Sequence, residues 1–292
     1  MRIITKMKRI LLLIASSACA QPPDWSIRLA DSYAITPNIT YSVQNNFESR
    51  LDVYRPRQAA SPVPVLLYIH GGGWVAGSKE VAFFQTMPYL AKGWAVVNVG
   101  YRLGRHSLAP AAVEDCLCAL RWVIRNAGTY KFDTTRIVVT GHSAGGHLSL
   151  TTGMLGGTDL HRQCPGNEPL KVAAIVNWFG ITDVPDLLDG AHRQDYAVAW
   201  LGSMPDRAAI ARRVSPLFHV SAAAPPVITI HGDADTVVPY QHGVRLHEAL
   251  TKAGVRNRLV TVPGGKHGGF PPDHLARAYK EIFAFLKETG LE

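Results

Sequence analysis

The sequence predicts an α/β protein built on a doubly wound, mostly parallel sheet, and three observations support this fold class. Short apolar runs recur along the chain, and continuous apolarity over four or five residues is typical of strands buried on both faces of a parallel sheet. Longer stretches with helical spacing separate several of them. The 292 residues are 47% hydrophobic and 18% charged, which is enough to bury a large core. The expected strands are 65–69, 95–99, 137–140, 174–177, 227–230 and 259–262, and the expected helices are 111–127, 242–253 and 272–287.

Two further stretches belong at the margins of this sheet. The runs 39–43 and 51–54 predict a hairpin on the sheet edge. Segment 181–224 fits the alternation poorly, because prolines and glycines interrupt its short helical patches. We expect it to form a small cap or insertion above the carboxyl ends of the strands, where open α/β sheets bind ligands. The alternative is a structural crossover. Without repeats or low-complexity linkers, we expect one domain over 21–292 with this possible cap.

The first 20 residues have the pattern of a secretory signal peptide. Four basic residues and no acid precede the apolar run 10–15, and small residues follow up to Ala20. This pattern predicts cleavage after Ala20 and a secreted or periplasmic protein. A lipoprotein acylated at Cys19 fits less well, because Ser16 stands where a leucine-like residue is expected.

The charge balance excludes a nucleic-acid-binding protein. The formal charge is +8, but half of it lies in the signal peptide, and the rest of the chain contains no run of basic residues. Elsewhere no apolar run approaches the length of a transmembrane helix. We therefore expect no nucleic-acid partner and no membrane span, and the oligomeric state stays open.

Three cysteines follow the signal peptide, so at least one thiol is unpaired within a monomer. Cys116 and Cys118 lie two apart on an expected helix, where their side chains do not face each other. A disulfide from either to Cys164 is possible in an oxidising compartment, and three free thiols are the alternative. The spacing matches neither a zinc site nor a dithiol motif, so we expect no metal and no cofactor.

The residues Gly141-His142-Ser143-Ala144-Gly145 lie between an expected strand and an expected helix. This is a G-x-S-x-G nucleophile motif in the strand–turn–helix context that it requires. The turn is so sharp that only very small residues fit around the serine. Ser143 is therefore the candidate nucleophile.

A glycine-rich run, His70-Gly71-Gly72-Gly73-Trp74, follows the expected strand 65–69. Three glycines let the backbone turn so that its N–H groups point at one spot, as an oxyanion hole needs. The candidate donors are the N–H groups of Gly72 and Gly73 together with that of Ala144. The Trp74 N–H is a possible substitute for one of them.

A base and an acid follow the last two expected strands. His267 lies in a glycine-rich loop after 259–262, and Asp233 and Asp235 follow 227–230. Ser143 needs such a base because a free hydroxyl is a poor nucleophile at neutral pH. The other histidines mostly suggest structural roles, although His142 and His147 flank the nucleophile and could contact substrate.

These motifs resemble the hormone-sensitive-lipase-type branch of the α/β-hydrolases, and most closely bacterial feruloyl or acetyl-xylan esterases of the BD-FAE type. The resemblance covers the chain from about residue 40 onward, apart from the polar insertion 157–170. It rests on LDVYRP at 51–56, HGGGW at 70–74, YRL at 101–103, GHSAGGH at 141–147, SP at 215–216, DADTVVP at 233–239 and KHG at 266–268.

The resemblance implies a catalytic triad and an oxyanion hole. The triad is Ser143, Asp235 and His267, with Asp233 accessory, and the hole is formed by Gly72, Gly73 and Ala144. For substrate binding we expect His142 and the Trp74 ring, the latter as a flat wall for an aromatic acyl group.

The resulting hypothesis is a secreted serine esterase that forms an acyl-enzyme on Ser143. Its substrates would be short-chain or aromatic acyl esters, such as acetyl or feruloyl decorations of plant polysaccharides or polyester-like polymers. Two alternatives are an arylformamidase-like amidase and a non-catalytic binding protein on a hydrolase fold. The amidase is disfavoured because that reaction serves intracellular metabolism, and the binding protein because the full triad is present.

Overall fold

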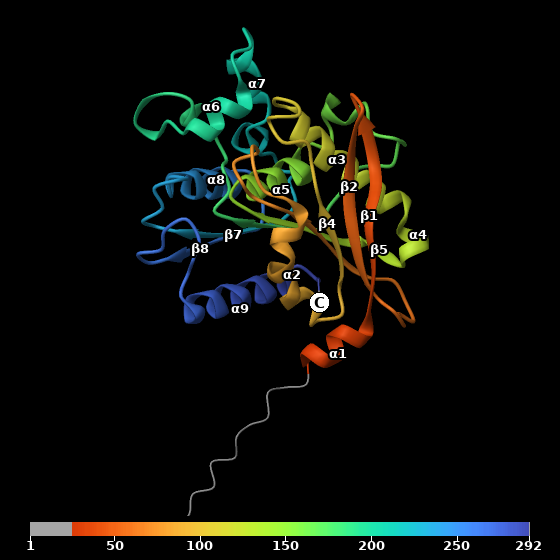
Figure 1. The fold of residues 1–292 in the computed structure, drawn as a ribbon. Helices are drawn as coiled ribbons and strands as arrows, with labels where there is room; N and C mark the ends of the chain where they lie inside the picture. The colour runs from red at the N-terminus through yellow and green to blue at the C-terminus, as the bar shows by residue number, and fades with distance from the viewer. Residues whose placement is uncertain (1–24, 292) are drawn as a thin grey trace, which may run out of the picture.

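The computed structural model describes residues 25–291, whose strands form one eight-stranded sheet with the order β1-β2-β4-β3-β5-β6-β7-β8 (Figure 1). The strands are β1 (Tyr33–Gln44), β2 (Phe47–Pro56), β3 (Val63–Ile69), β4 (Ala95–Val99), β5 (Phe132–His142), β6 (Ala174–Trp178), β7 (Val227–Gly232) and β8 (Asn257–Val262). The helices are α1 (Trp25–Ser32), α2 (Phe83–Leu90), α3 (Ala111–Arg125), α4 (Ala127–Tyr130), α5 (Ala144–Met154), α6 (Asp195–Leu201), α7 (Arg207–Arg213), α8 (Gln241–Lys252) and α9 (Pro272–Glu288).

The sheet is parallel except at one edge. β1 pairs antiparallel with β2, and β2 pairs antiparallel with β4, whereas the pairs from β4 through β8 are all parallel. The predicted fold class is confirmed. The edge hairpin is present, but its strands are longer than the predicted runs 39–43 and 51–54 because polar residues on the exposed face interrupt the apolar pattern.

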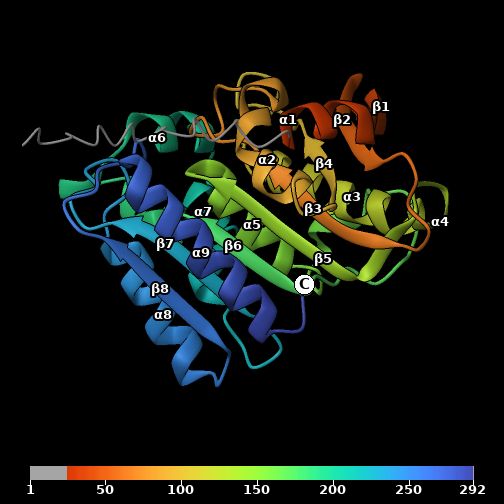
Figure 2. The same cartoon turned by 90° about the horizontal axis from the view of Figure 1, so that it is seen from below.

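Helices cover both faces of the sheet (Figure 2). On one face, α3 and α5 pack with alternate strand residues such as Leu67 and Val139. On the other face, α2 and α9 pack with the intervening residues such as Leu66 and Val138. Each central strand is therefore buried on both sides, which is why its sequence is continuously apolar.

Not every helix of the two layers was predicted from the sequence. The expected helices appear as α3, α8 and α9 with ends shifted by at most two residues. Helix α2 is only eight residues long and contains Pro88, and both features weaken the sequence signal for a helix. The predicted signal peptide, residues 1–20, lies outside the described residues.

Two of the three cysteines outside the predicted signal peptide are paired. Cys118 on α3 forms a disulfide with Cys164, and Cys116 is a buried free thiol. The bond ties the polar insertion 157–170 to the helical layer. No helix between residues 25 and 291 is long and apolar enough to cross a membrane.

The 181–224 segment is packed onto the body of the protein. It contains α6 and α7, and its residues Val184, Leu187 and Trp200 are buried in the core beside α3 and α5. Tyr196 lies directly against Gly73, and its hydroxyl donates to the Val237 carbonyl oxygen at 3.2 Å. The segment therefore covers the glycine-rich loop after β3.

Candidate active site

The nucleophile motif forms a sharp turn between β5 and α5. Ser143 has φ 58° and ψ −120°, a backbone conformation that non-glycine residues seldom adopt. A Cβ atom on Gly145 would collide with the Ile69 carbonyl oxygen, so only glycine fits this close approach. Such strain is characteristic of a functional turn that lifts one side chain out of the fold.

Ser143, His267 and Asp235 form a continuous hydrogen-bonded relay. The Ser143 hydroxyl lies 2.8 Å from His267 Nε2, and His267 Nδ1 lies 2.7 Å from Asp235 Oδ2. A carboxylate can only accept at the second contact, so His267 carries its proton on Nδ1 and offers Nε2 as the acceptor for the serine proton. The geometry brings together the nucleophile, base and acid that the sequence suggested.

Asp235 is held in its ionised form. Its Oδ1 accepts the backbone N–H groups of Val237 at 2.8 Å and Val238 at 3.0 Å, and His231 Nε2 lies 3.4 Å from Oδ2. Burial raises the pKa of this carboxyl, but the contacts with His231, His267 and Val238 outweigh burial and hold the pKa well below its usual range.

Asp233 lies outside the relay. It is exposed, and its Oδ1 accepts the Gly264 backbone N–H at 2.6 Å. This bond joins the turn after β7 to the loop after β8, which carries His267. The two aspartates therefore make different contacts. Asp235 binds the His267 ring, and Asp233 binds the backbone of the loop that carries His267.

The glycine-rich loop after β3 lies beside the nucleophile. A Cβ atom on Gly71 would stand 3.6 Å from Ser143 Cβ. The Gly72 carbonyl oxygen accepts the N–H groups of Val75 at 3.1 Å and Ala76 at 3.0 Å. No hydrogen bond among residues 25–291 uses the N–H groups of Gly72, Gly73 or Ala144. These three donors therefore remain free for a ligand.

The expectation for the Trp74 ring is wrong. Its side chain is 0% exposed, stacks on Trp200 with ring centroids 4.1 Å apart, and donates from Nε1 to His147 Nδ1 at 3.1 Å. The opposite ring nitrogen of His147 lies 2.7 Å from the Val214 carbonyl oxygen, and burial lowers the pKa of His147 to about 3. Trp74 and His147 therefore anchor the 181–224 segment from beneath and do not face a substrate.

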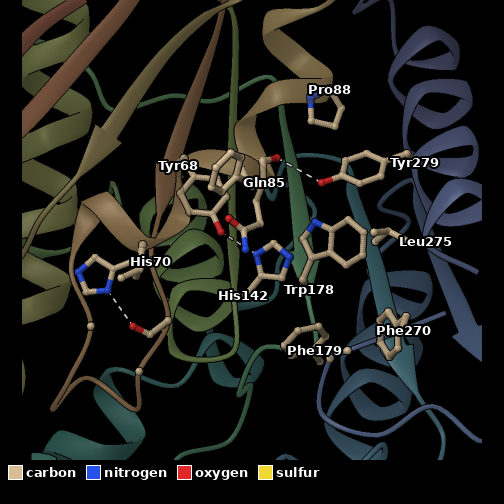
Figure 3. Close-up of a pocket in the computed structure, with 17 residues that line it drawn as sticks. Tyr68, His70, Gln85, Pro88, His142, Trp178, Phe179, Phe270, Leu275 and Tyr279 are labelled. Carbon is tan, nitrogen blue, oxygen red and sulfur yellow. Dashed lines mark hydrogen bonds between the residues drawn. The ribbon is translucent and has the colours of Figure 1, made fainter. Parts of the chain in front are cut away.

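A cavity of about 680 Å³ (Figure 3) is lined in part by His142 and Gly268, the chain neighbours of Ser143 and His267. Its apolar rim includes Val81, Phe84 and Leu275, whose exposed fractions are 69%, 74% and 39%. None of its lining residues comes from 181–224, and that segment instead meets the site at Gly73, against which Tyr196 packs. Six of the lining residues are Phe, Trp or Tyr: Tyr68, Phe84, Trp178, Phe179, Phe270 and Tyr279.

His142 is the predicted substrate-binding residue that does border this cavity. It ends β5, in register with Trp178 on β6, and the two rings stack with centroids 4.9 Å apart. On the opposite side, the Tyr68 hydroxyl lies 2.8 Å from His142 Nδ1. Figure 3 shows the His142 ring between Tyr68 and Trp178.

Phe179 is a site residue that the sequence reasoning missed. It follows β6 with φ 39°, an unfavourable value for a bulky side chain, and its ring lies 4.8 Å from His267 and 5.8 Å from Phe270. The strained backbone directs an aromatic ring against the base and into the cavity. The available signal was its place directly after a strand, at the edge where the other site residues gather.

The strand order, the strained serine turn and the relay together define an α/β-hydrolase. A family model described as BD-FAE matches residues 51–250, and the chain belongs to this family.

Among curated proteins, esterase LipC of Mycobacterium tuberculosis is 30% identical over 75% of this chain and 56% of its own. The chain thus spans about half the length of that relative. A truncated carbohydrate esterase from gut microbiota has a TM-score of 0.77 at 29% identity, covering 90% of this chain and 98% of the other. A propionate-bound thermophilic esterase of Thermogutta terrifontis has a TM-score of 0.73 at 28% identity, covering 89% of this chain and 95% of the other.

Proposed function

We propose that the protein is a serine carboxylic-ester hydrolase, and the observation that carries this proposal is the Ser143–His267–Asp235 relay, with an aromatic cavity lined by its chain neighbours His142 and Gly268. The relatives named as esterases support the ester as substrate class. The free N–H groups of Gly72, Gly73 and Ala144 suit a reaction that develops negative charge on a carbonyl oxygen.

The geometry supports a two-step mechanism. His267 Nε2 accepts the proton of Ser143 while Oγ attacks the ester carbonyl carbon, and Asp235 stabilises the resulting imidazolium. The N–H groups of Gly72, Gly73 and Ala144 would bind the oxyanion of the tetrahedral intermediate. Collapse of this intermediate expels the alcohol, which takes the proton from His267, and leaves an acyl group on Ser143. A water molecule, deprotonated by His267, then attacks the acyl carbon. The second tetrahedral intermediate collapses as His267 returns the proton to Ser143 Oγ, which releases the carboxylic acid and the free serine.

For the acyl group, we propose acetyl and other short chains together with flat aromatic groups such as feruloyl. Small acyl groups need little more than the space beside Ser143. An aromatic acyl group would fill the cavity beside His142, whose rings offer stacking surfaces on several sides. The carbohydrate esterase among the structural neighbours supports acyl decorations of polysaccharides as the natural source of such esters.

We also propose that the protein is exported, since polysaccharide-borne or polyester-like substrates lie outside the cell. The N-terminal pattern over 1–20 motivates this proposal. Expression of the full chain followed by N-terminal sequencing of the exported form tests it. The expected first residue is Gln21, and a protein retained in the cytoplasm with Met1 in place would contradict export.

A panel of p-nitrophenyl esters from acetate to laurate, run beside acetylated and feruloylated xylan fragments, tests the substrate assignment. We expect activity on p-nitrophenyl acetate and butyrate and release of acetate or ferulate from the saccharides. Activity on the p-nitrophenyl esters with none on the saccharides would remove the polysaccharide assignment while leaving the esterase intact. No hydrolysis of any ester would contradict the proposed function.

A further inference from the structure

His142 contributes a polar ring to an otherwise largely aromatic cavity wall. Tyr68, His142 and Trp178 stand side by side because they lie on three adjacent strands. Tyr68 is in register with Thr140, two residues before His142, and side chains two apart point to the same face of a sheet. Stacking on Trp178 and the contact with Tyr68 fix the ring in place.

The contact with Tyr68 determines which ring nitrogen of His142 carries the proton. The Tyr68 side chain is buried, and its hydroxyl proton needs an acceptor. His142 Nδ1, at 2.8 Å, is the hydrogen-bond partner that the structure gives this hydroxyl. If Nδ1 donated instead, the phenolic proton would have no acceptor among residues 25–291. Tyr68 therefore donates to Nδ1, and the proton of the neutral imidazole lies on Nε2.

The surroundings also keep the ring neutral. Burial and the nearby His267 lower the pKa of His142 to about 3, and burial raises the pKa of Tyr68 far above its ordinary value, so the phenol keeps its proton. His142 Nε2 has no hydrogen-bond partner among residues 25–291, and it is not among the fully buried polar atoms without a partner. Its N–H therefore opens into the cavity that the ring borders.

We propose that His142 is a specificity-determining residue whose Nε2–H donates a hydrogen bond to an oxygen atom carried by a planar acyl group in this cavity. The inference rests on the proposed esterase function and deepens it. Trp178 and Phe179 supply aromatic surface on the same side of the cavity, and His142 supplies the polar contact that distinguishes one aromatic acyl group from another.

The direction of this hydrogen bond predicts which substituents are recognised. A donor on the protein needs only a lone pair on the substrate, so a ring methoxy group should serve as well as a ring hydroxyl group. An acyl group with neither should lose the contact. Recognition by an accepting nitrogen would instead favour the hydroxyl group alone.

The test compares kcat/KM for methyl cinnamate with kcat/KM for ring-hydroxylated and ring-methoxylated methyl cinnamates. In the natural protein we expect the best oxygenated ester to exceed cinnamate by about three- to ten-fold, the range for one neutral hydrogen bond. His142→Phe keeps an aromatic ring for stacking and should bring this ratio close to one. His142→Gln offers an N–H near the position of Nε2 and should retain part of the preference.

Two tyrosine variants distinguish an effect of the His142 tautomer from a general effect of removing a buried hydroxyl group. Tyr68→Phe removes the hydroxyl that fixes the proton and should lower the preference for oxygenated acyl groups. Tyr89→Phe is the matched control, because Tyr89 is buried in the same layer and its hydroxyl has no hydrogen-bond partner among the described residues. A ¹H–¹⁵N spectrum of histidine-labelled protein reports the ring nitrogen that carries the proton, and we expect Nε2.

Four results would overturn the inference: a proton on Nδ1 in the natural protein, an unchanged substrate ratio in His142→Phe, equal ratios in His142→Gln and His142→Phe, or a preference for the hydroxyl group alone. Each of these results is compatible with hydrolysis of p-nitrophenyl acetate by the natural protein. Absence of that hydrolysis would instead contradict the proposed function itself.

Discussion

Replacing Asp235 with asparagine should disable the base without removing it. The two backbone N–H groups of Val237 and Val238 bind Oδ1, so the carbonyl oxygen of the new amide must take that position. Its NH₂ group then replaces Oδ2 and points at His267 Nδ1, 2.7 Å away in the natural protein. A donor at this place forces Nδ1 to accept, which moves the imidazole proton to Nε2. His267 can then no longer accept the proton of Ser143.

The expected loss in kcat is on the order of 10⁴, by analogy with the same substitution in a serine protease triad. This factor corresponds to about 5 kcal/mol of transition-state stabilisation. Asp233→Asn is the matched control, since its amide oxygen can still accept the Gly264 N–H and should cost less than about ten-fold. Steady-state hydrolysis of p-nitrophenyl acetate, with circular dichroism to verify folding, measures both. Equal or reversed losses would refute the assignment of the acid.

Three further predictions concern the nucleophile, the buried histidines and the disulfide. Ser143→Ala should lower ester hydrolysis by several orders of magnitude while the unfolding temperature changes little, and a variant that keeps more than a tenth of the activity would contradict the nucleophile assignment. The free energy of unfolding should fall as the pH drops from about 6.5 toward 4, because burial lowers the pKa of several histidines, which stay neutral in the folded protein while the unfolded chain binds protons. Each such group contributes a slope of about 1.4 kcal/mol per pH unit, and urea unfolding at pH 7, 6 and 5 that gave one value would refute this. Cys164→Ala should lower the free energy of unfolding by about 4 kcal/mol, given a sequence separation of 46 between the bonded cysteines, and equal urea midpoints for variant and natural protein would contradict it. The buried histidines with lowered pKa are His70, His142, His147, His242 and His247.

The parts that sequence predicted are those encoded locally. A buried parallel strand is apolar throughout, so β3 to β8 were visible as short runs, and the glycines around Ser143 marked the turn that only they can form. The site residues then follow the ends of their strands, which meet at one edge of the sheet. The relay could therefore be expected before its distances were known.

The parts that sequence did not predict depend on packing between distant segments. Trp74 suggested a wall for the substrate, but its ring fills the core because Trp200, more than a hundred residues later, stacks on it. The choice between Cys116 and Cys118 depended on which face of α3 meets the insertion 157–170. The cavity walls from α2 and α9 likewise come together only in the folded chain, with the Tyr279 hydroxyl donating to the Gln85 carbonyl oxygen at 3.2 Å.

The central claim is that Ser143 carries the acyl group during turnover. Rapid mixing with p-nitrophenyl acetate, an acid quench and mass spectrometry of the digested protein test it most directly. The account predicts one acetyl group on the peptide that contains Ser143, formed in the burst phase and absent from Ser143→Ala. An acetyl group that persists at the same level in Ser143→Ala, or one found on another residue of the active protein, would contradict it.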